Sequence, residues 1–194
     1  MKRKHISTVI VVGILLAAMV FAAGCTSNNN TPTPSVASAT RDPKFVPKNT
    51  SGYLTYSNRS AGISIQYPSS WTKTEGKPTE TVSFNLGTSA FFTVTAPEKL
   101  ETMTLDDYSQ GAVSGIQRLN DFKLLNSTNS TLSGYPAKRL VYTYVNEDTP
   151  SQAMLQLTLV NRTGYALLYT TTQSLYPNYL GIAQNMTQSF NITK

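Results

Sequence analysis

The sequence predicts an α+β fold in which a central, mainly antiparallel β-sheet is packed by two helices. Three observations lead to this prediction. Short segments with alternating apolar and polar residues recur between residues 62 and 172. Turns such as Asn146-Glu147-Asp148 and 161–164 are short enough to join neighbouring strands as hairpins. Two longer stretches repeat apolar residues at helical spacing, and helices of this kind bury their apolar stripe by covering a sheet.

Three strands are predicted ahead of the first helix. The first covers residues 62–68 and is stopped by Pro68, which cannot extend a strand ladder. The other two cover 81–86 and 90–96 and are joined by a turn that contains glycine. Trp71, which follows the first strand, is expected to fill the core rather than to bind a ligand. In the first two strands, alternate residues are apolar and share one face: Ile63, Ile65, Tyr67, Val82, Phe84 and Leu86.

The first helix is predicted over residues 104–121. Its apolar residues form one narrow stripe at helical spacing, namely Leu105, Tyr108, Ala112, Ile116 and Leu119. Thr104 is a favourable N-cap residue, and Asp107 three positions later resembles the second member of a capping box. The sequence therefore predicts where this helix begins and which side of it faces the core.

Three further strands and a closing helix follow. The strands are predicted at 136–145, 152–160 and 165–172. In the middle one, alanine and leucine alternate with glutamine and threonine, so we expect one sheet face to be buried and the other to be partly polar. The closing helix covers 177–190, and Pro177 suits its first turn, where a missing N–H leaves nothing unsatisfied.

The first 25 residues are typical of a lipoprotein export signal. A basic start is followed by an apolar stretch from Ile6 to Phe21, which is shorter than a membrane span needs to be. Small residues then precede Cys25, the only cysteine of the chain. We expect residues 1–24 to be removed and Cys25 to carry the lipid that holds the protein on the extracytoplasmic side of the cell membrane. Ordinary cleavage and an uncleaved anchor are the alternatives.

The segment that follows the signal is predicted to be a spacer. Residues 25–52 are rich in Asn, Thr, Pro and Ser, a composition that cannot bury enough apolar surface to fold. Residues 53–194 have the size of one domain. From Asn49 onward, ten Lys and Arg oppose nine Asp and Glu, so most of the formal charge of +6 lies ahead of the domain. This near neutrality argues against nucleic acid as a partner.

The predicted mature chain has no histidine, because His5 lies in the signal. This composition excludes Ser-His-Asp and Cys-His catalysis and histidine-ligated zinc, and no phosphate-binding loop or nucleophile elbow occurs. We therefore expect no catalytic residue and no cofactor. The one carboxylate cluster, which opens the first helix, is a weak candidate for a calcium-like site. Helix capping explains it better. Its members are Glu98, Glu101, Asp106 and Asp107.

Four tyrosines on the late strands are candidates for a binding face. Tyr142 and Tyr144 lie on one predicted strand, and Tyr165 and Tyr169 lie on another. Tyrosine supplies contact area at low entropic cost, which suits a recognition surface. The alternative is that these side chains simply cover the sheet and hydrogen-bond at its margins.

Sequons for N-glycosylation are dense in this chain. Two of them, at Asn29 and Asn49, lie ahead of the predicted domain. Six lie within it, at Asn58, Asn126, Asn129, Asn161, Asn185 and Asn191. Either they follow from a composition rich in Asn, Ser and Thr, or they mark surface glycosylation after export.

The chain resembles PsbP-like domains in four ordered segments. Residues 62–71 read Gly-Ile-Ser-Ile-Gln-Tyr-Pro-Ser-Ser-Trp, like the opening of such domains. Three further matches follow, at 104–108, 132–137 and 189–192. The resemblance is to archaeal PsbP-related and DcrB-like lipoproteins, within the nuclear-import-factor/PsbP fold superfamily. It implies an antiparallel sheet between helices, an α/β/α sandwich, and a non-enzymatic role in docking to larger assemblies. It implies no site residue.

Together these observations predict a lipid-anchored, extracytoplasmic, non-catalytic interaction module that docks on another envelope protein. The alternative is a small-ligand or solute-binding lipoprotein with a cleft beside the tyrosine-bearing strands. An enzyme has no positive support in the sequence. A docking module should show an exposed apolar patch, whereas a ligand carrier should show an enclosed and largely apolar cavity.

Overall fold

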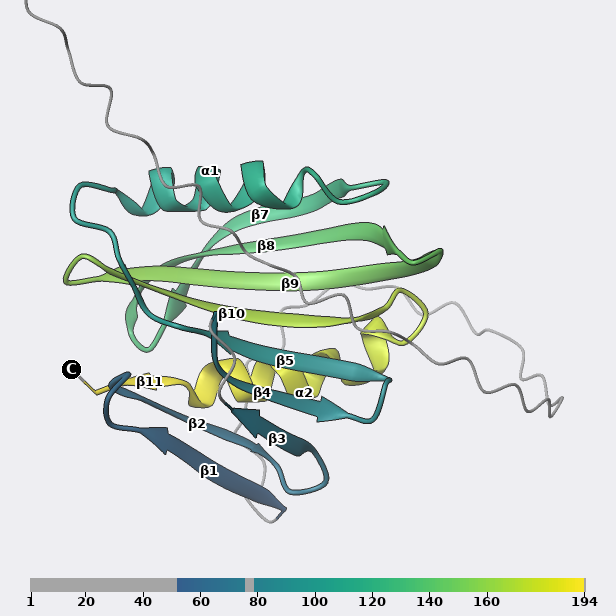
Figure 1. Ribbon diagram of the computed structural model, residues 1–194, viewed down its shortest axis with the longest axis horizontal. Coiled ribbons are helices and arrows are strands. Elements are labelled where there is room, and N and C mark those ends of the chain that lie inside the picture. Colours follow the sequence, from purple (N-terminus) through teal and green to yellow (C-terminus); the bar gives the residue numbers. More distant parts are fainter. Residues whose placement is uncertain (1–51, 76–78, 194) are drawn as a thin grey trace, which may run out of the picture.

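The computed structural model describes residues 52–75 and 79–193, and the predicted signal, Cys25 and most of the predicted spacer lie outside them. The chain runs through small antiparallel strands first, then through long hairpins, with one helix in the middle and one near the end (Figure 1). The elements are β1 (Tyr53–Asn58), β2 (Ile63–Pro68), β3 (Thr72–Glu75), β4 (Glu80–Leu86), β5 (Ala90–Thr95), β6 (Glu98–Lys99), α1 (Leu105–Ile116), β7 (Lys123–Leu132), β8 (Tyr135–Asn146), β9 (Thr149–Val160), β10 (Thr163–Thr172), α2 (Tyr176–Ser189) and β11 (Asn191–Ile192).

Two sheets form, and every strand pair in them is antiparallel. The main sheet has eight strands in the order β3-β4-β5-β10-β9-β8-β7, with β6 paired to β10. A small sheet has the order β1-β2-β11, so it joins the first strands of the domain to its last one. The predicted α+β class with a mainly antiparallel central sheet is therefore confirmed.

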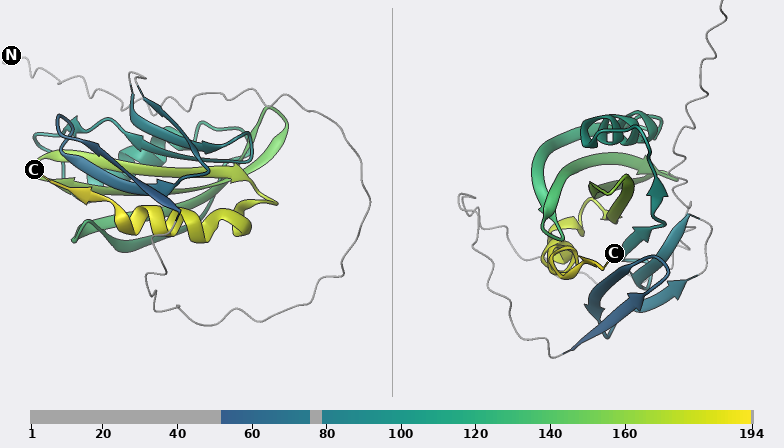
Figure 2. Two further views of the ribbon diagram at one scale, coloured as in Figure 1. Left: turned by 90° about the horizontal axis from the view of Figure 1, so that it is seen from below. Right: turned by 90° about the vertical axis from the view of Figure 1, so that its left-hand side faces the viewer.

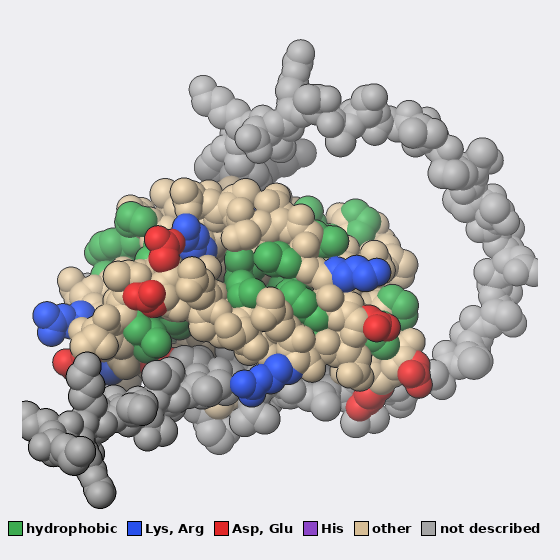
Figure 3. Space-filling model, turned by 90° about the horizontal axis from the view of Figure 1, so that it is seen from above, with side chains coloured by type: hydrophobic (Ala, Val, Ile, Leu, Met, Phe, Trp, Pro, Cys, Tyr) green, Lys and Arg blue, Asp and Glu red, His purple; other side chains and the backbone are tan. Residues whose placement is uncertain are grey.

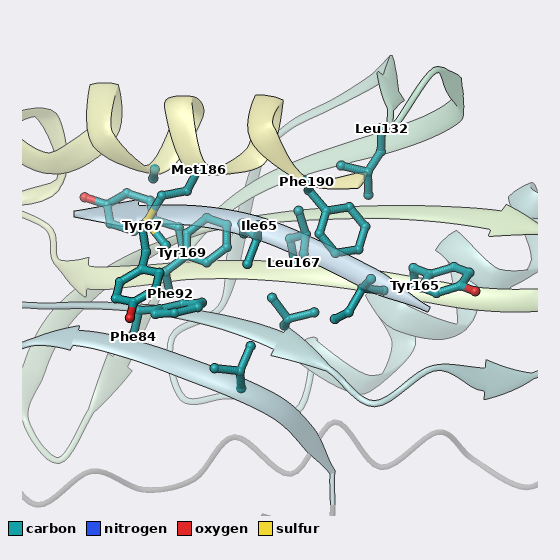
Figure 4. Close-up of a cluster of buried hydrophobic side chains, with 14 of the residues drawn as sticks. Ile65, Tyr67, Phe84, Phe92, Leu132, Tyr165, Leu167, Tyr169, Met186 and Phe190 are labelled. Atoms are coloured by element: carbon teal, nitrogen blue, oxygen red, sulfur yellow. The ribbon is translucent and has the colours of Figure 1, made fainter. Parts of the chain in front are cut away.

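The main sheet lies between two apolar clusters. On one side, α1 packs on β8, β9 and β10 through Tyr108, Ala112 and Ile116. On the other side, α2 and the small sheet cover the same strands, and Figure 2 shows the sheet enclosed between α1 and α2. Figure 4 shows this second cluster, in which side chains of β2, β4, β5, β10 and α2 meet, Phe84 and Phe92 among them. The predicted apolar faces of both helices and of the early strands are confirmed.

The second sheet face is partly polar, as expected, but it is buried as well. Gln156 is 1% exposed and Thr158 is fully buried, because α2 and the small sheet cover their side of β9. Both side chains are hydrogen-bonded. Gln156 accepts from Arg139 Nε at 3.2 Å and donates to the carbonyl of Thr131 at 2.8 Å, and Thr158 donates to the carbonyl of Pro136 at 2.7 Å. These bonds offset the cost of burying polar groups in an apolar core.

The predicted capping box at the start of α1 is confirmed. The Asp107 amide donates to Thr104 Oγ1 at 3.1 Å, and the Thr104 amide donates to Asp107 Oδ2 at 3.1 Å. The Thr104 hydroxyl, which donates to Asp107 Oδ2 at 2.7 Å, and the Thr104 amide together lower the pKa of the Asp107 carboxyl. The helix ends at Ile116 rather than at Asp121, because the amides of Arg118 and Leu119 bond to the carbonyls three residues earlier and the chain turns.

Replacing Thr104 with alanine is expected to lower the free energy of unfolding by about 1 kcal/mol, because the Asp107 amide at the helix start loses the hydroxyl that caps it. Urea unfolding monitored by circular dichroism measures this change. Thr104→Ser keeps the hydroxyl and is the control, for which we expect a loss well below that of alanine. Equal losses in the two variants would contradict a capping role.

Candidate interaction surface

The four tyrosines proposed as a binding face are core residues. Their exposed fractions range from 0 to 7%. Tyr142 and Tyr144 belong to the cluster under α1, whereas Tyr165 and Tyr169 belong to the cluster under α2. The two pairs therefore lie on opposite faces of the main sheet, and they form no common surface. The prediction of a tyrosine-lined recognition face is wrong.

Each of these tyrosines packs against another ring. Tyr142 lies 5.7 Å from Phe122 between ring centroids and 5.9 Å from Tyr144. Tyr169 lies 5.2 Å from Tyr176 and donates its hydroxyl to the carbonyl of Tyr176 at 2.9 Å. Burial raises the pKa of Tyr142, Tyr144 and Tyr169 above the usual value for tyrosine. The rings therefore stabilise the fold as neutral, packed side chains.

The carboxylate cluster at the start of α1 is divided among separate structural roles. Asp107 caps the helix, and Asp106 forms an ion pair with Lys138 of β8 at 2.8 Å. Glu98 lies half-buried in β6, where desolvation raises the pKa of its carboxyl, and Glu101 is exposed. Within residues 52–75 and 79–193, no three acidic, histidine or cysteine side chains come close enough to hold a metal ion.

The six sequon asparagines of the domain fall into two groups. Four are exposed: Asn126, Asn129, Asn161 and Asn191. The other two, Asn58 and Asn185, are half-buried. Asn58 binds the Ala61 amide through Oδ1 at 2.9 Å and the Tyr56 hydroxyl through Nδ2 at 3.2 Å, so its amide is engaged in a turn. Asn185 has a buried Oδ1 with no hydrogen-bond partner among the described residues. Glycosylation stays a prediction, and it fits the four exposed positions better.

The most apolar exposed feature of the described domain is a pair of leucines at the start of β7. Leu124 is 42% exposed and Leu125 is 54% exposed. The register with β8 shifts between Leu124 and Asn126, which leaves Leu125 in a β-bulge outside the ladder. Sequence reasoning missed this pair, although two adjacent leucines beside a polar run were a visible signal. The leucines give the domain an exposed apolar patch, which we call the leucine patch.

Depressions in the surface of the described residues support a ligand-binding site less well than the leucine patch supports a docking site. One depression lies where the β8–β9 hairpin meets the β10–α2 loop, and it is open to solvent. It is lined by Thr149, Pro150, Thr172, Gln173 and Ser174. A carrier of small molecules needs an enclosed cavity with apolar walls, and this open depression is a different kind of site.

Charges on the side of the molecule that α1 covers are mixed. Figure 3 shows Lys and Arg side chains scattered among Asp and Glu over this face, with no continuous basic stripe. This agrees with the near-neutral balance of the domain. Among the described residues, no helix is long and apolar enough to cross a membrane.

Comparison with known proteins gives one family and several structures of the same fold. The family model described as PsbP-like protein matches residues 8–178. No curated protein matches the chain in sequence. The solved structure of CyanoP, the cyanobacterial PsbP of Synechocystis sp. PCC 6803, has a TM-score of 0.58 at 14% identity and covers 77% of this chain and 97% of CyanoP.

A second solved structure is the Ran-binding protein Mog1p of Saccharomyces cerevisiae. It has a TM-score of 0.54 at 10% identity and covers 73% of this chain and 96% of Mog1p. A protein of Bacteroides thetaiotaomicron gives 0.53 at 14% identity, over 72% of this chain and 48% of that protein. At these identities, the likeness concerns the fold.

Proposed function

The chain belongs to the PsbP-like protein family, and from this membership we propose that it is a non-catalytic, extracytoplasmic interaction module. In this proposal a lipid on Cys25 anchors the chain to the membrane, the spacer lifts the domain from the surface, and the domain docks on another envelope protein.

The observation that carries the docking proposal is the leucine patch. Leu124 and Leu125 are about half-exposed, so a partner that covers them gains about 1 kcal/mol for each leucine. Exposed apolar side chains that adjoin one another mark interaction sites more often than singly scattered ones do. Phe122 and Leu119, both half-buried against the α1 cluster, lie just before them in the chain.

Two further observations support binding rather than chemistry. Two of the acidic side chains near α1 have structural roles, since Asp107 caps the helix and Asp106 forms an ion pair with Lys138. The fold itself also occurs in Mog1p, which is a Ran-binding protein. A non-enzymatic binding role is therefore compatible with this architecture.

Crosslinking in membranes of the source organism, followed by affinity capture and mass spectrometry, tests the proposal. We compare the unmodified chain with the double variant Leu124→Ser/Leu125→Ser. We expect one envelope protein to be captured by the unmodified chain and its recovery to fall at least about tenfold with the variant, because the two leucines contribute about 2 kcal/mol.

The matched control is Leu54→Ser in β1, which removes a leucine of 49% exposure far along the chain from the patch. It should capture the same protein as the unmodified chain. A second control is a chain that has the spacer but lacks the domain. Recovery that is equal for the patch variant and the unmodified chain would contradict docking through the leucines. Recovery no higher than that of the spacer alone would contradict the interaction module itself.

A further inference from the structure

We propose that β7 pairs edge to edge with β7 of a second copy of this chain, so that two main sheets join into one across a two-fold axis. The inference does not rest on the proposed docking to an envelope protein. It comes from a difference between the two edges of the main sheet and from the side chains that β7 would bring together.

The two edge strands of the main sheet are built differently. β3 is four residues long and carries Lys73 and Glu75, which form an ion pair at 2.5 Å. Short length and charge are common ways to keep an edge from pairing. β7 is ten residues long, and Leu124 to Leu132 contain neither a charged residue nor a proline. Among the described strands, β8 is its only neighbour in the ladder order.

The middle of β7 is complementary to itself. In an antiparallel pair centred on Thr128, both copies keep the same sheet faces, Thr128 stands opposite its own copy and Ser127 stands opposite Asn129. All three side chains are exposed and uncharged, and cross-strand pairs of hydroxyl and amide groups stabilise a sheet. The bulge at Leu125 ends the regular ladder on one side, and the two-fold axis repeats this limit on the other, so the pairing segment is 126–130.

The charged residues near β7 also permit a second copy to pair with it. The nearest cation on β8, Lys138, is 2.8 Å from Asp106 and 2.8 Å from Asn129 Oδ1, so its charge is balanced within its own chain. Lys123 lies at the end of β7, outside the pairing segment, and the two-fold axis keeps it away from its own copy. If β7 of one copy paired with β3 of another, a strand of ten residues would meet a strand of four. Pairing of β7 with β7 instead matches two strands of equal length and gives a closed dimer.

Disulfide trapping of the full chain in membranes tests this pairing. Thr128→Cys places two thiols on the two-fold axis, where the Cα atoms of paired residues lie about 4.5–5.5 Å apart, within the range of a disulfide. Cys25 is the only other cysteine and is present in every variant. We expect a crosslinked dimer on a non-reducing gel, in at least about fivefold excess over the control Thr74→Cys on the exposed β3 edge.

The register gives a second readout. Ser127→Cys should crosslink less than Thr128→Cys, because its copy lies two residues further along the pair. Dimer yields no higher for Thr128→Cys than for Thr74→Cys would overturn the proposal. So would a glycan on Asn126 or Asn129 in most of the native protein, since it would occupy the space of the second strand. Loss of envelope-protein capture by the leucine variant leaves the expected disulfide unchanged, so the two proposals fail independently.

Discussion

We expect the domain to unfold cooperatively as the pH is raised above about 10, because buried tyrosines must ionise when the chain unfolds. Burial raises the pKa of Tyr108 and Tyr142 strongly, and both side chains are at most 6% exposed. Burial also raises the pKa of Tyr176 to about 12. In the unfolded chain the pKa of a tyrosine returns to about 10.

The sign of the effect follows from proton binding. Between pH 10 and the raised pKa, the unfolded chain binds fewer protons than the folded one, so the free energy of unfolding falls as pH rises. The contribution of each such tyrosine is fully present below pH 10. Above it, Tyr108 and Tyr142 each cost about 1.4 kcal/mol per pH unit, and domains of this size are stable by about 5–15 kcal/mol.

Circular dichroism and tyrosinate absorbance, recorded on the same samples from pH 6 to pH 12, measure this effect. We expect secondary structure to be lost in the same narrow pH interval in which most tyrosinate appears. Between pH 6 and 8 the stability should be flat, since the one histidine of the chain lies at position 5, outside the domain. Tyrosinate that forms gradually from pH 10 while the circular dichroism stays constant would contradict burial of these rings.

The sequence predicted those elements whose stability comes from burial of one face. In β2, β4 and α1, apolar residues alternate or repeat at helical spacing, and the structure buries most of the predicted residues. β3 and β7 were not predicted, because most of their side chains are exposed and polar and carry no periodic signal. Backbone hydrogen bonds attach β3 to β4 and β7 to β8. The composition of β7 by itself resembles that of a loop.

The prediction of a tyrosine-lined face failed because it depends on the register between strands, which the sequence does not reveal. Alternation correctly places Tyr142 with Tyr144, and Tyr165 with Tyr169, on shared faces. Which faces coincide depends on the register between strands. Tyr142 pairs with Ala153 of β9, and Tyr169 pairs with Met154, the next residue, so the two tyrosine pairs face opposite ways. The bulge that exposes Leu125 is likewise a property of pairing.

Replacing Gly164 with valine is expected to destabilise the domain by about 3 kcal/mol or more, because no side chain fits between β10 and α1. A Cβ atom at Gly164 would lie 2.8 Å from Leu100 Cδ1 and 2.9 Å from Tyr108 Cζ. Both neighbours are 6% exposed, so neither ring nor methyl can move into solvent. The close approach of Tyr108 to Gly164 lets this ring pack α1 on the sheet. We therefore expect Gly164→Ala to lower the free energy of unfolding by about 1–3 kcal/mol.

Gly181→Ala is the matched control, and its expected effect has the opposite sign. Gly181 is exposed in α2, and a Cβ there meets nothing within 4 Å. Alanine should therefore raise the free energy of unfolding by about 0.5–1 kcal/mol, through its higher helix propensity. Urea unfolding of the three variants measures the difference. A Gly164→Val variant as stable as the unmodified domain would mean that α1 packs further from β10 than this structure places it. Destabilisation by Gly181→Ala would mean instead that the exposed side of α2 is covered in solution.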